Sequence, residues 1–295
     1  MTKIHPTAII DATATVAGSA EIGPYCVIGP EVDIGPGCIL HDHVTVQSET
    51  RLGADNVIYP YSVIGADPQD RKFHGERALC VIGDRNQIRE HVTVHRGTAN
   101  GGGSTVIGSD NLIMVAVHIA HDCMVGDHVT IANQVMLAGH VVVEDYANIG
   151  GGVGVHHFAT IGECSFVGAM ARIPKDVPPY MIVEGNPAEV RAVNTIALSR
   201  RAFPVEDIEA IKDAFKRLYR KNGPPMSDKL DQLRAEYPRI EAIAKLCAAL
   251  EATAEGVHGR AREVERTDDK RSCETEVLVR PIALVPAAGG RRVES

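Results

Sequence analysis

The chain has 295 residues, with 38 acidic and 30 basic side chains, so its formal net charge is −8. This balance argues against a general nucleic-acid binder, because phosphate backbones need clustered lysine and arginine. No apolar run approaches the ~18 residues of a membrane helix. The N-terminus also lacks the apolar segment of a signal peptide, so we expect a cytoplasmic protein without a membrane span.

Aliphatic residues recur at every sixth position over much of the chain. The first series is Ile4, Ile10, Val16, Ile22, Ile28, Ile34, Leu40, Val46, Leu52, Ile58 and Ile64, and it resumes at Ile82, Ile88 and Val94. A third series, shifted by one residue, is Ile107, Ile113, Ile119, Val125, Ile131, Leu137, Val143, Ile149, Val155, Ile161, Val167 and Ile173. Small residues often stand four places later. The seven cysteines include no Cys-x-x-Cys pair, which favours buried thiols over disulfides.

A period of six fits neither a helix nor an ordinary alternating strand. It fits a short strand followed by a tight turn, with the aliphatic side chain pointing inward and glycine supplying the turn dihedrals. Three such units close one coil of 18 residues. This hexapeptide repeat is typical of the left-handed parallel β-helix; the left hand comes from that repeat class, because the general rule favours right-handed crossovers.

The repeat is interrupted twice and then stops. We predict a β-helix over residues 1–190, with excursions near 65–81 and 97–106. Prolines follow Ile173, and a helical period then begins, in which Ile208, Ile211, Phe215 and Leu218 share one face. We therefore predict a helical domain over residues 191–256. Residues 257–295 lose all period and are predicted to be a flexible tail.

Histidines gather at one edge of the predicted coil. Positions 18 apart stack at about 4.8 Å, so His121, Gly139 and His157 form one column. Asp122 and His140 form the column beside it, while His118 and His156 adjoin these positions. Polar groups from three successive coils thus converge, which predicts a functional site.

The residue types indicate acid–base chemistry. A neutral imidazole is a suitable general base near pH 7, so His121 is the candidate base and Asp122 its orienting partner. The N–H of Gly139 can approach a reacting carbonyl as an oxyanion donor. Cys123 has inward parity, so direct attack by a substrate hydroxyl or amine is the simpler mechanism. It requires no cofactor or metal; the opposing hypothesis is zinc bound by histidines.

Several segments resemble one family of hexapeptide acyltransferases. They are residues 82–86 (Ile-Gly-Asp-Arg-Asn), 94–98 (Val-His-Arg-Gly-Thr), 116–123 (Ala-Val-His-Ile-Ala-His-Asp-Cys), 137–140 (Leu-Ala-Gly-His) and 176–180 (Asp-Val-Pro-Pro-Tyr). They resemble the UDP-N-acetylglucosamine O-acyltransferases, which initiate lipid A synthesis. The resemblance implies a homotrimer that transfers a 3-hydroxyacyl chain from acyl carrier protein to the 3-hydroxyl of UDP-N-acetylglucosamine.

Carried over by position, the resemblance implies catalytic roles for His121, Asp122 and Gly139. It implies substrate contacts for Gln69, Asp70, Lys72, His118, His140, His156, His157, Asn194, Arg200 and Arg201, and His95 is a further candidate. Gln69 corresponds to an acyl contact, and Asp70 and Lys72 to sugar and phosphate contacts. Asn194 and Arg200 correspond to the nucleotide side.

Three positions depart from the family pattern. His157 stands where many members have Gln, and Ile196 where the well-known form has Glu. Ala169 occupies the position that limits acyl length, which suggests a medium-long chain. An amine acceptor on an amino-sugar nucleotide remains an alternative, because the same base serves both acceptors. A catalytically silent scaffold is the non-enzyme alternative, and the presence of His121 argues against it.

Overall fold

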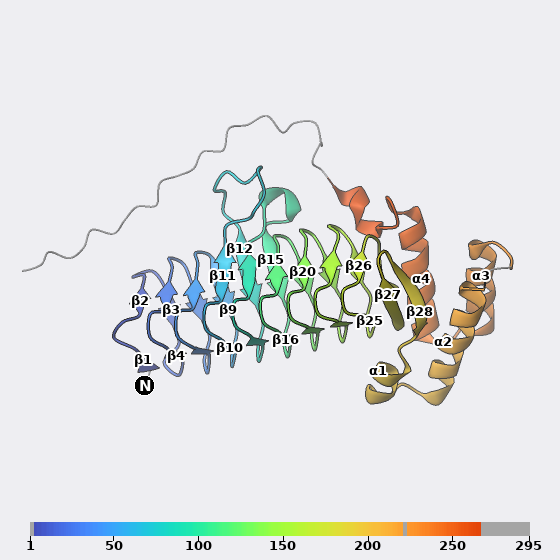
Figure 1. The fold of residues 1–295 in the computed structure, drawn as a ribbon, viewed down its shortest axis with the longest axis horizontal. Helices are drawn as coiled ribbons and strands as arrows, with labels where there is room; N and C mark the ends of the chain where they lie inside the picture. Colours follow the sequence, from blue (N-terminus) through green and yellow to red (C-terminus); the bar gives the residue numbers. More distant parts are fainter. Residues whose placement is uncertain (1–2, 221–222, 267–295) are drawn as a thin grey trace, which may run out of the picture.

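Short strands wound into stacked coils build most of the molecule. The structure is a computed structural model, and it describes residues 3–220 and 223–266. Figure 1 shows the coils in a row from β1 to β26, with the helices at the C-terminal end. The strands of the coils are β1 (Lys3–Ile4), β2 (Ile9–Ile10), β3 (Thr15–Val16), β4 (Glu21–Ile22), β5 (Val27–Ile28), β6 (Asp33–Ile34), β7 (Ile39–Leu40), β8 (Thr45–Val46), β9 (Thr50–Leu52), β10 (Val57–Ile58), β11 (Val63–Ala66), β12 (Leu79–Ile82), β13 (Gln87–Ile88), β14 (Thr93–His95), β15 (Ser104–Ile107), β16 (Leu112–Ile113), β17 (His118–Ile119), β18 (Met124–Val125), β19 (Thr130–Ile131), β20 (Met136–Leu137), β21 (Val142–Val143), β22 (Asn148–Ile149), β23 (Gly154–Val155), β24 (Thr160–Ile161), β25 (Phe166–Val167) and β26 (Arg172–Ile173).

The coils form three parallel sheets, in which every third strand along the chain is a neighbour. Ile131 pairs with Ile149, one coil of 18 residues further along. The hexad aliphatics point inward, and those from Ile22 onward are almost fully buried. Six cysteines are free and buried, whereas Cys273 lies outside the described residues. The predicted left-handed parallel β-helix is confirmed.

Glycine has a different role in the turns from the predicted one. Most left-handed turn residues are not glycine, and they include Asp122 (φ 60°), His140 (φ 63°) and Phe158 (φ 63°). The glycine that follows a hexad aliphatic is needed because the next coil lies close. A Cβ on Gly35 would lie 2.4 Å from the carbonyl oxygen of Gly53. The prediction that glycine supplies the turn dihedrals holds at Gly37 and Gly152 (φ 70° and 69°), but most left-handed corners present other side chains.

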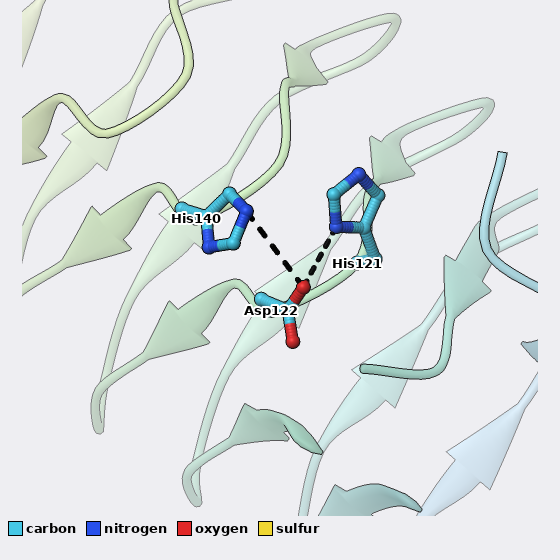
Figure 2. A group of neighbouring side chains, drawn as sticks. All are labelled: His121, Asp122 and His140. Atoms are coloured by element: carbon cyan, nitrogen blue, oxygen red, sulfur yellow. Dashed lines mark hydrogen bonds and ion pairs between the residues drawn. The ribbon is translucent and has the colours of Figure 1, made fainter. Parts of the chain in front are cut away.

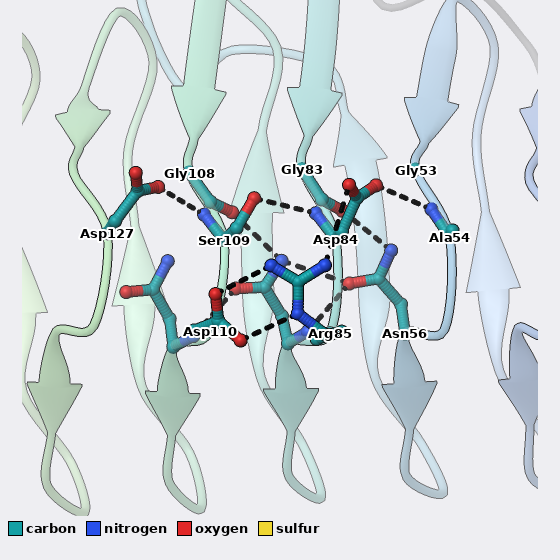
Figure 3. Close-up of polar contacts among 12 residues, drawn as sticks. Gly53, Ala54, Asn56, Gly83, Asp84, Arg85, Gly108, Ser109, Asp110 and Asp127 are labelled. Carbon is teal, nitrogen blue, oxygen red and sulfur yellow. Dashed lines mark hydrogen bonds and ion pairs between the residues drawn. The ribbon is translucent and has the colours of Figure 1, made fainter.

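A column of asparagines stabilises one inner corner of the coil (Figure 3). The side-chain amide of Asn86 donates to Asn56 Oδ1 and to the carbonyl oxygen of Gly108, both at 2.9 Å. Asn86 Oδ1 accepts from the backbone N–H of Asn111 at 3.0 Å. These three asparagines are at most 2% exposed. Their hydrogen bonds pair backbone groups that burial would otherwise leave without water.

Two loops leave the coil on the same side (Figure 1). They span residues 67–78, between β11 and β12, and residues 96–103, between β14 and β15. The second loop contains the short helix η1 (Ala99–Gly101). Both are shorter than the predicted excursions, because β12 pairs with β15 from Leu79 onward.

A hairpin and helices close the C-terminal end of the coil. The hairpin strands are β27 (Met181–Gly185) and β28 (Ala188–Val193). The helices are α1 (Thr195–Arg200), α2 (Val205–Leu218), α3 (Met226–Glu236) and α4 (Glu241–Glu255). The sequence indicated α2 to α4 but neither α1 nor the hairpin. No helix in the described ranges has the length and apolar character of a membrane span, and the predicted domain limits remain predictions.

The stretch after α4 differs from the predicted flexible tail. Residues 257–266 contain the helix η2 (Ala261–Glu265), and Arg260 and Glu263 are buried. Polar contacts rather than an apolar face hold this segment, so hydrophobic periodicity could not reveal it. The rest of the predicted tail, residues 267–295, lies outside the described residues.

Candidate active site

One corner of the coil places Asp122, His140 and Phe158 above one another. Each has the left-handed turn conformation that repeats every 18 residues. The rings of His140 and Phe158 stack, with their centroids 4.3 Å apart. His140 Nε2 lies 3.8 Å from Asp122 Oδ2. The coil geometry thus fixes this column, as the sequence spacing predicted.

His121 and Asp122 form the central contact of this corner (Figure 2). His121 Nδ1 lies 2.8 Å from Asp122 Oδ2. Because an ionised carboxylate only accepts, this contact favours the tautomer with the proton on Nδ1, which leaves the lone pair of the neutral ring on Nε2. Among the described residues, Nε2 has no hydrogen-bond partner. The His121 side chain is 14% exposed, so a substrate can reach it.

Asp122 is held by donors from the second loop. Thr98 donates to its two oxygens, from the backbone N–H at 2.8 Å and from the hydroxyl at 2.7 Å. Burial opposes ionisation of Asp122, but the hydrogen bonds from His121 and Thr98 outweigh it and lower the pKa of the carboxyl. Sequence reasoning gave Thr98 no role, because only the path of the loop brings it to Asp122.

Gly139 lies directly against the His121 ring. A Cβ at this position would lie 2.6 Å from His121 Cε1 and 2.8 Å from Nε2. Within the described part of the chain, the N–H of Gly139 has no acceptor. An unpaired N–H beside an accessible imidazole is the arrangement that an oxyanion donor requires.

A second pair of histidines lies next to this corner. His118 Nδ1 is 2.8 Å from the hydroxyl of Thr93, and its ring meets that of His95 edge-on. Burial, together with the neighbouring histidines, lowers the pKa of His118. Burial likewise lowers the pKa of His95, whose Nδ1 is buried without a partner among the described residues. Both rings are therefore neutral near pH 7.

An apolar groove of about 550 Å³ begins at His118. Its lining includes Gln69, Met136, Val155 and His156. The Met136 side chain is 55% exposed, and the groove walls are mostly aliphatic. The structure thus brings the predicted acyl contact Gln69 together with His118 and His156.

A smaller cavity of about 220 Å³ is lined in part by His140. Asp70 and Lys72 line it from the first loop, and Phe158 lines it from the coil. Residues of the C-terminal segment, Arg262 and Arg266 among them, complete the wall. The predicted polar contacts are therefore brought together, with added cations that sequence reasoning missed.

His157 faces the C-terminal segment. Its Nε2 lies 3.2 Å from Arg266 Nη1 and 3.6 Å from Glu263 Oε1. The His156 ring lies beside it, with centroids 3.9 Å apart. Burial, followed by the neighbouring positive groups, lowers the pKa of His157 to about 4.

Two groups of side chains in the described ranges could hold a metal ion. They are His121, Asp122 and His140, and His156, His157 and Glu263. In each group the ligand atoms lie within 4.8 Å of one another, as a zinc site requires. In the first group Asp122 already accepts from His121 and Thr98. An ion there would have to displace the hydrogen bond that orients His121.

The residues predicted for the nucleotide side lie at the C-terminal end. Asn194 caps α1 through its side-chain oxygen and donates to the carbonyl oxygen of Cys164 at 2.8 Å. The Arg201 guanidinium lies 3.4 Å from the centre of the Tyr146 ring, and Arg200 is exposed. None of the three predicted residues lines either cavity at the histidines.

The two remaining departures are surface residues. Ile196 is 64% exposed, and Ala169 lies exposed beside Met170, which is 76% exposed. Ala169 is outside the lining of the apolar groove. Its effect on chain length stays a prediction.

Comparisons with known proteins show which family the chain resembles over most of its length. A family model described as UDP N-acetylglucosamine O-acyltransferase, domain 2, matches residues 176–258. Models for bacterial transferase hexapeptides and for a GMPPB C-terminal domain match residues 104–139 and 4–100. A relative from Saccharophagus degradans, acyl-[acyl-carrier-protein]–UDP-N-acetylglucosamine O-acyltransferase, is 44% identical over 87% of this chain and 99% of its own length.

Solved structures show the same similarity. UDP-N-acetylglucosamine acyltransferase from Francisella novicida is 39% identical, with a TM-score of 0.81 over 84% of this chain and 91% of its own. The O-acyltransferase from Moraxella catarrhalis is 42% identical, with a TM-score of 0.80 over 83% and 95%. The family that the sequence motifs resemble is confirmed: the chain belongs to the UDP-N-acetylglucosamine O-acyltransferases.

Proposed function

We propose that the chain transfers a 3-hydroxyacyl group from acyl carrier protein to the 3-hydroxyl of UDP-N-acetylglucosamine, the first step of lipid A biosynthesis. The observation that carries this proposal is the His121–Asp122 hydrogen bond beside the unpaired N–H of Gly139, in a chain of this family. It leaves one accessible base and one amide donor at the same point.

His121 Nε2 removes the proton of the sugar hydroxyl as the hydroxyl oxygen attacks the thioester carbonyl carbon. The negative charge that develops on the carbonyl oxygen is stabilised by the N–H of Gly139. The tetrahedral intermediate then collapses, and the bond to the carrier sulfur breaks. The departing thiolate takes the proton from the His121 imidazolium, which restores the neutral base. Asp122 keeps the proton on Nδ1 and stabilises the imidazolium.

In this proposal each of the two cavities binds a different part of the substrates. The apolar groove beside His118 fits the acyl chain, with Gln69 and His156 at its polar points. The cavity with Asp70 and Lys72 fits the nucleotide sugar. Cys123 is unsuited as a nucleophile, because burial raises the pKa of its thiol to about 12.

The proposal includes a cytoplasmic homotrimer. Asn194, Arg200 and Arg201 line neither cavity of their own protomer, and in the proposed trimer they act at the site of a neighbouring protomer. Exposed Met124, Met136 and Met170 provide apolar surface along the coil. Light scattering of the purified protein measures the mass, and a monomer that retains full turnover would contradict a shared site.

Mass spectrometry of the reaction products tests the activity. Purified protein is incubated with UDP-N-acetylglucosamine and 3-hydroxyacyl carrier proteins of several chain lengths. One mono-acylated UDP sugar is expected, and its mass gives the acyl-chain length, which the prediction for Ala169 expects to be medium-long. Absence of product with this sugar but formation of an amide with its 3-amino analogue would favour the amine acceptor. Loss of turnover after dialysis against a chelator would favour zinc at His121, Asp122 and His140.

A further inference from the structure

The segment of residues 259–266, here called the C-terminal strap, continues past the family model, which ends at residue 258. Asp176 at the end of the coil holds its first residues. The Asp176 N–H donates to the carbonyl oxygen of Gly259, and Asp176 Oδ2 accepts from the N–H of Ala261, both at 2.8 Å. These bonds fix the direction in which the strap leaves α4.

A buried ion pair then fixes the turn of the strap. Arg260 Nε lies 2.9 Å from Glu263 Oε2, and the two side chains are 7% and 5% exposed. Arg260 Nη1 also donates to the carbonyl oxygen of Pro174 at 2.5 Å. Because removing one partner would leave a buried charge, such a pair holds a single geometry.

In this conformation the strap places two guanidinium groups next to His140 and His157. Arg262 Nη1 donates to the carbonyl oxygen of His140 at 2.8 Å. Arg266 Nη1 lies 3.2 Å from His157 Nε2. Both arginine side chains remain partly exposed, at 26% and 22%, and both line the 220 Å³ cavity with Lys72.

Positive charge prevails in the lining of that cavity. Lys72, Arg262 and Arg266 contribute three cations, and Asp70 and Glu265 contribute two carboxylates. Glu265 Oε2 lies 3.5 Å from Arg262 Nε. Guanidinium groups suit phosphate because their N–H donors match two of its oxygens.

We propose that Arg262 and Arg266 form, with Lys72, an anion subsite that binds a phosphate group of a substrate. This inference rests on the proposed function, whose two substrates both carry phosphate. One source is the diphosphate of the nucleotide sugar, and the other is the phosphodiester of the pantetheine arm on the carrier protein. The strap thus supplies binding groups from a part of the chain that the family model does not cover.

A charge-neutral double variant tests the subsite in the full chain. Arg262→Gln and Arg266→Gln remove both positive charges and leave a shorter, uncharged amide at each position. Arg239→Gln, an exposed arginine between α3 and α4, is the matched control. Calorimetry with inorganic pyrophosphate measures the subsite directly, and steady-state kinetics give KM for each substrate.

The double variant is expected to weaken pyrophosphate binding about tenfold or more, with the control unchanged. A matching rise in KM for the UDP sugar identifies the diphosphate as the occupant, whereas a rise only for acyl carrier protein identifies the pantetheine phosphodiester. Equal pyrophosphate affinity in wild type and double variant overturns the subsite. So does a fall in kcat with both KM values unchanged, because it assigns the strap to positioning His140.

The two proposals can fail separately. If the wild-type chain forms no acylated UDP sugar, the proposed function fails, and the pyrophosphate comparison still decides the subsite. If the product forms and pyrophosphate affinity is insensitive to the double substitution, only the subsite fails. Circular dichroism and melting temperature show that the variants compared are folded.

Discussion

Two columns of residues in the same β-helix differ in how fully their polar groups are hydrogen-bonded. In the asparagine column, Asn86 uses both amide hydrogens and its oxygen within the protein. In the column of His121 and Gly139, His121 uses only Nδ1, and the N–H of Gly139 has no acceptor among the described residues. The first column is at most 2% exposed, whereas the His121 side chain is 14% exposed.

This difference in hydrogen bonding distinguishes residues that stabilise the β-helix from residues that can react with a substrate. A buried polar group that is fully paired stabilises the fold, and leaving it unpaired costs free energy. A polar group that is oriented by one partner but left open on its other side is available to a substrate. Function in this solenoid is therefore expected where the ladder of hydrogen bonds is incomplete.

The largest expected effect is the loss of the base. His121→Ala should lower kcat by about 10³-fold, because general-base catalysis contributes about 10²–10⁴. The melting temperature should fall only modestly, because buried Asp122 loses the His121 donor but keeps both donors of Thr98. Steady-state turnover and thermal unfolding are measured together. Unchanged turnover would show that His121 is not the base. The column that contains it would then have no catalytic role to set against the structural role of the asparagines.

The next effect concerns the close approach at Gly139. Gly139→Ala places a methyl group about where the His121 ring lies, 2.6 Å from Cε1. The imidazole must then move, and kcat should fall about 10²-fold, as a displaced reacting group does. Gly223→Ala, whose Cβ would meet only the end of the Lys229 side chain at 3.3 Å, is the control for a methyl group added away from both cavities. Equal turnover in both variants would show that the contact between Gly139 and the His121 ring does not position the base.

The asparagine column should respond in the opposite way. Asn86→Ala leaves the Gly108 carbonyl and the Asn111 N–H buried without partners, at a cost of about 3 kcal/mol in the free energy of unfolding. Turnover per folded molecule should stay close to that of the wild type, because the Asn86 side chain lines neither cavity. Denaturant unfolding measures the loss. A large fall in kcat with unchanged stability would reverse the proposed division of roles.

The smallest expected effect is on the pH dependence of stability, through His157, which contacts the C-terminal strap. Burial lowers the pKa of His157 from its ordinary 6.5 to about 4 in the folded chain. Between these values the unfolded chain binds a proton there and the folded chain does not, so stability falls as pH falls. His157→Gln should therefore reduce the loss of melting temperature between pH 7 and pH 5. An identical loss in both proteins would show that other groups cause the acid sensitivity.

Much of the fold is determined by local pattern. Hexad aliphatics predict the coil because every short strand has the same inward position, and the spacing of 18 predicts that Asp122 and His140 meet. Helix α2 follows from its helical period. Helix α1 is too short for a periodic signal, and the hairpin of β27 and β28 follows a run of prolines that breaks every period.

The sequence by itself determined the repeat, the family motifs and two neighbouring columns, His121 above Gly139 and Asp122 above His140, because repetition converts spacing along the chain into stacking in space. Only the tertiary structure decided which groups complete the site. Thr98 reaches Asp122 through the path of a loop, and Arg262 reaches His140 through a strap anchored by polar contacts. Such contacts join residues that are far apart in the chain and do not recur at a fixed spacing. They therefore produce no repeating sequence pattern from which they could be predicted.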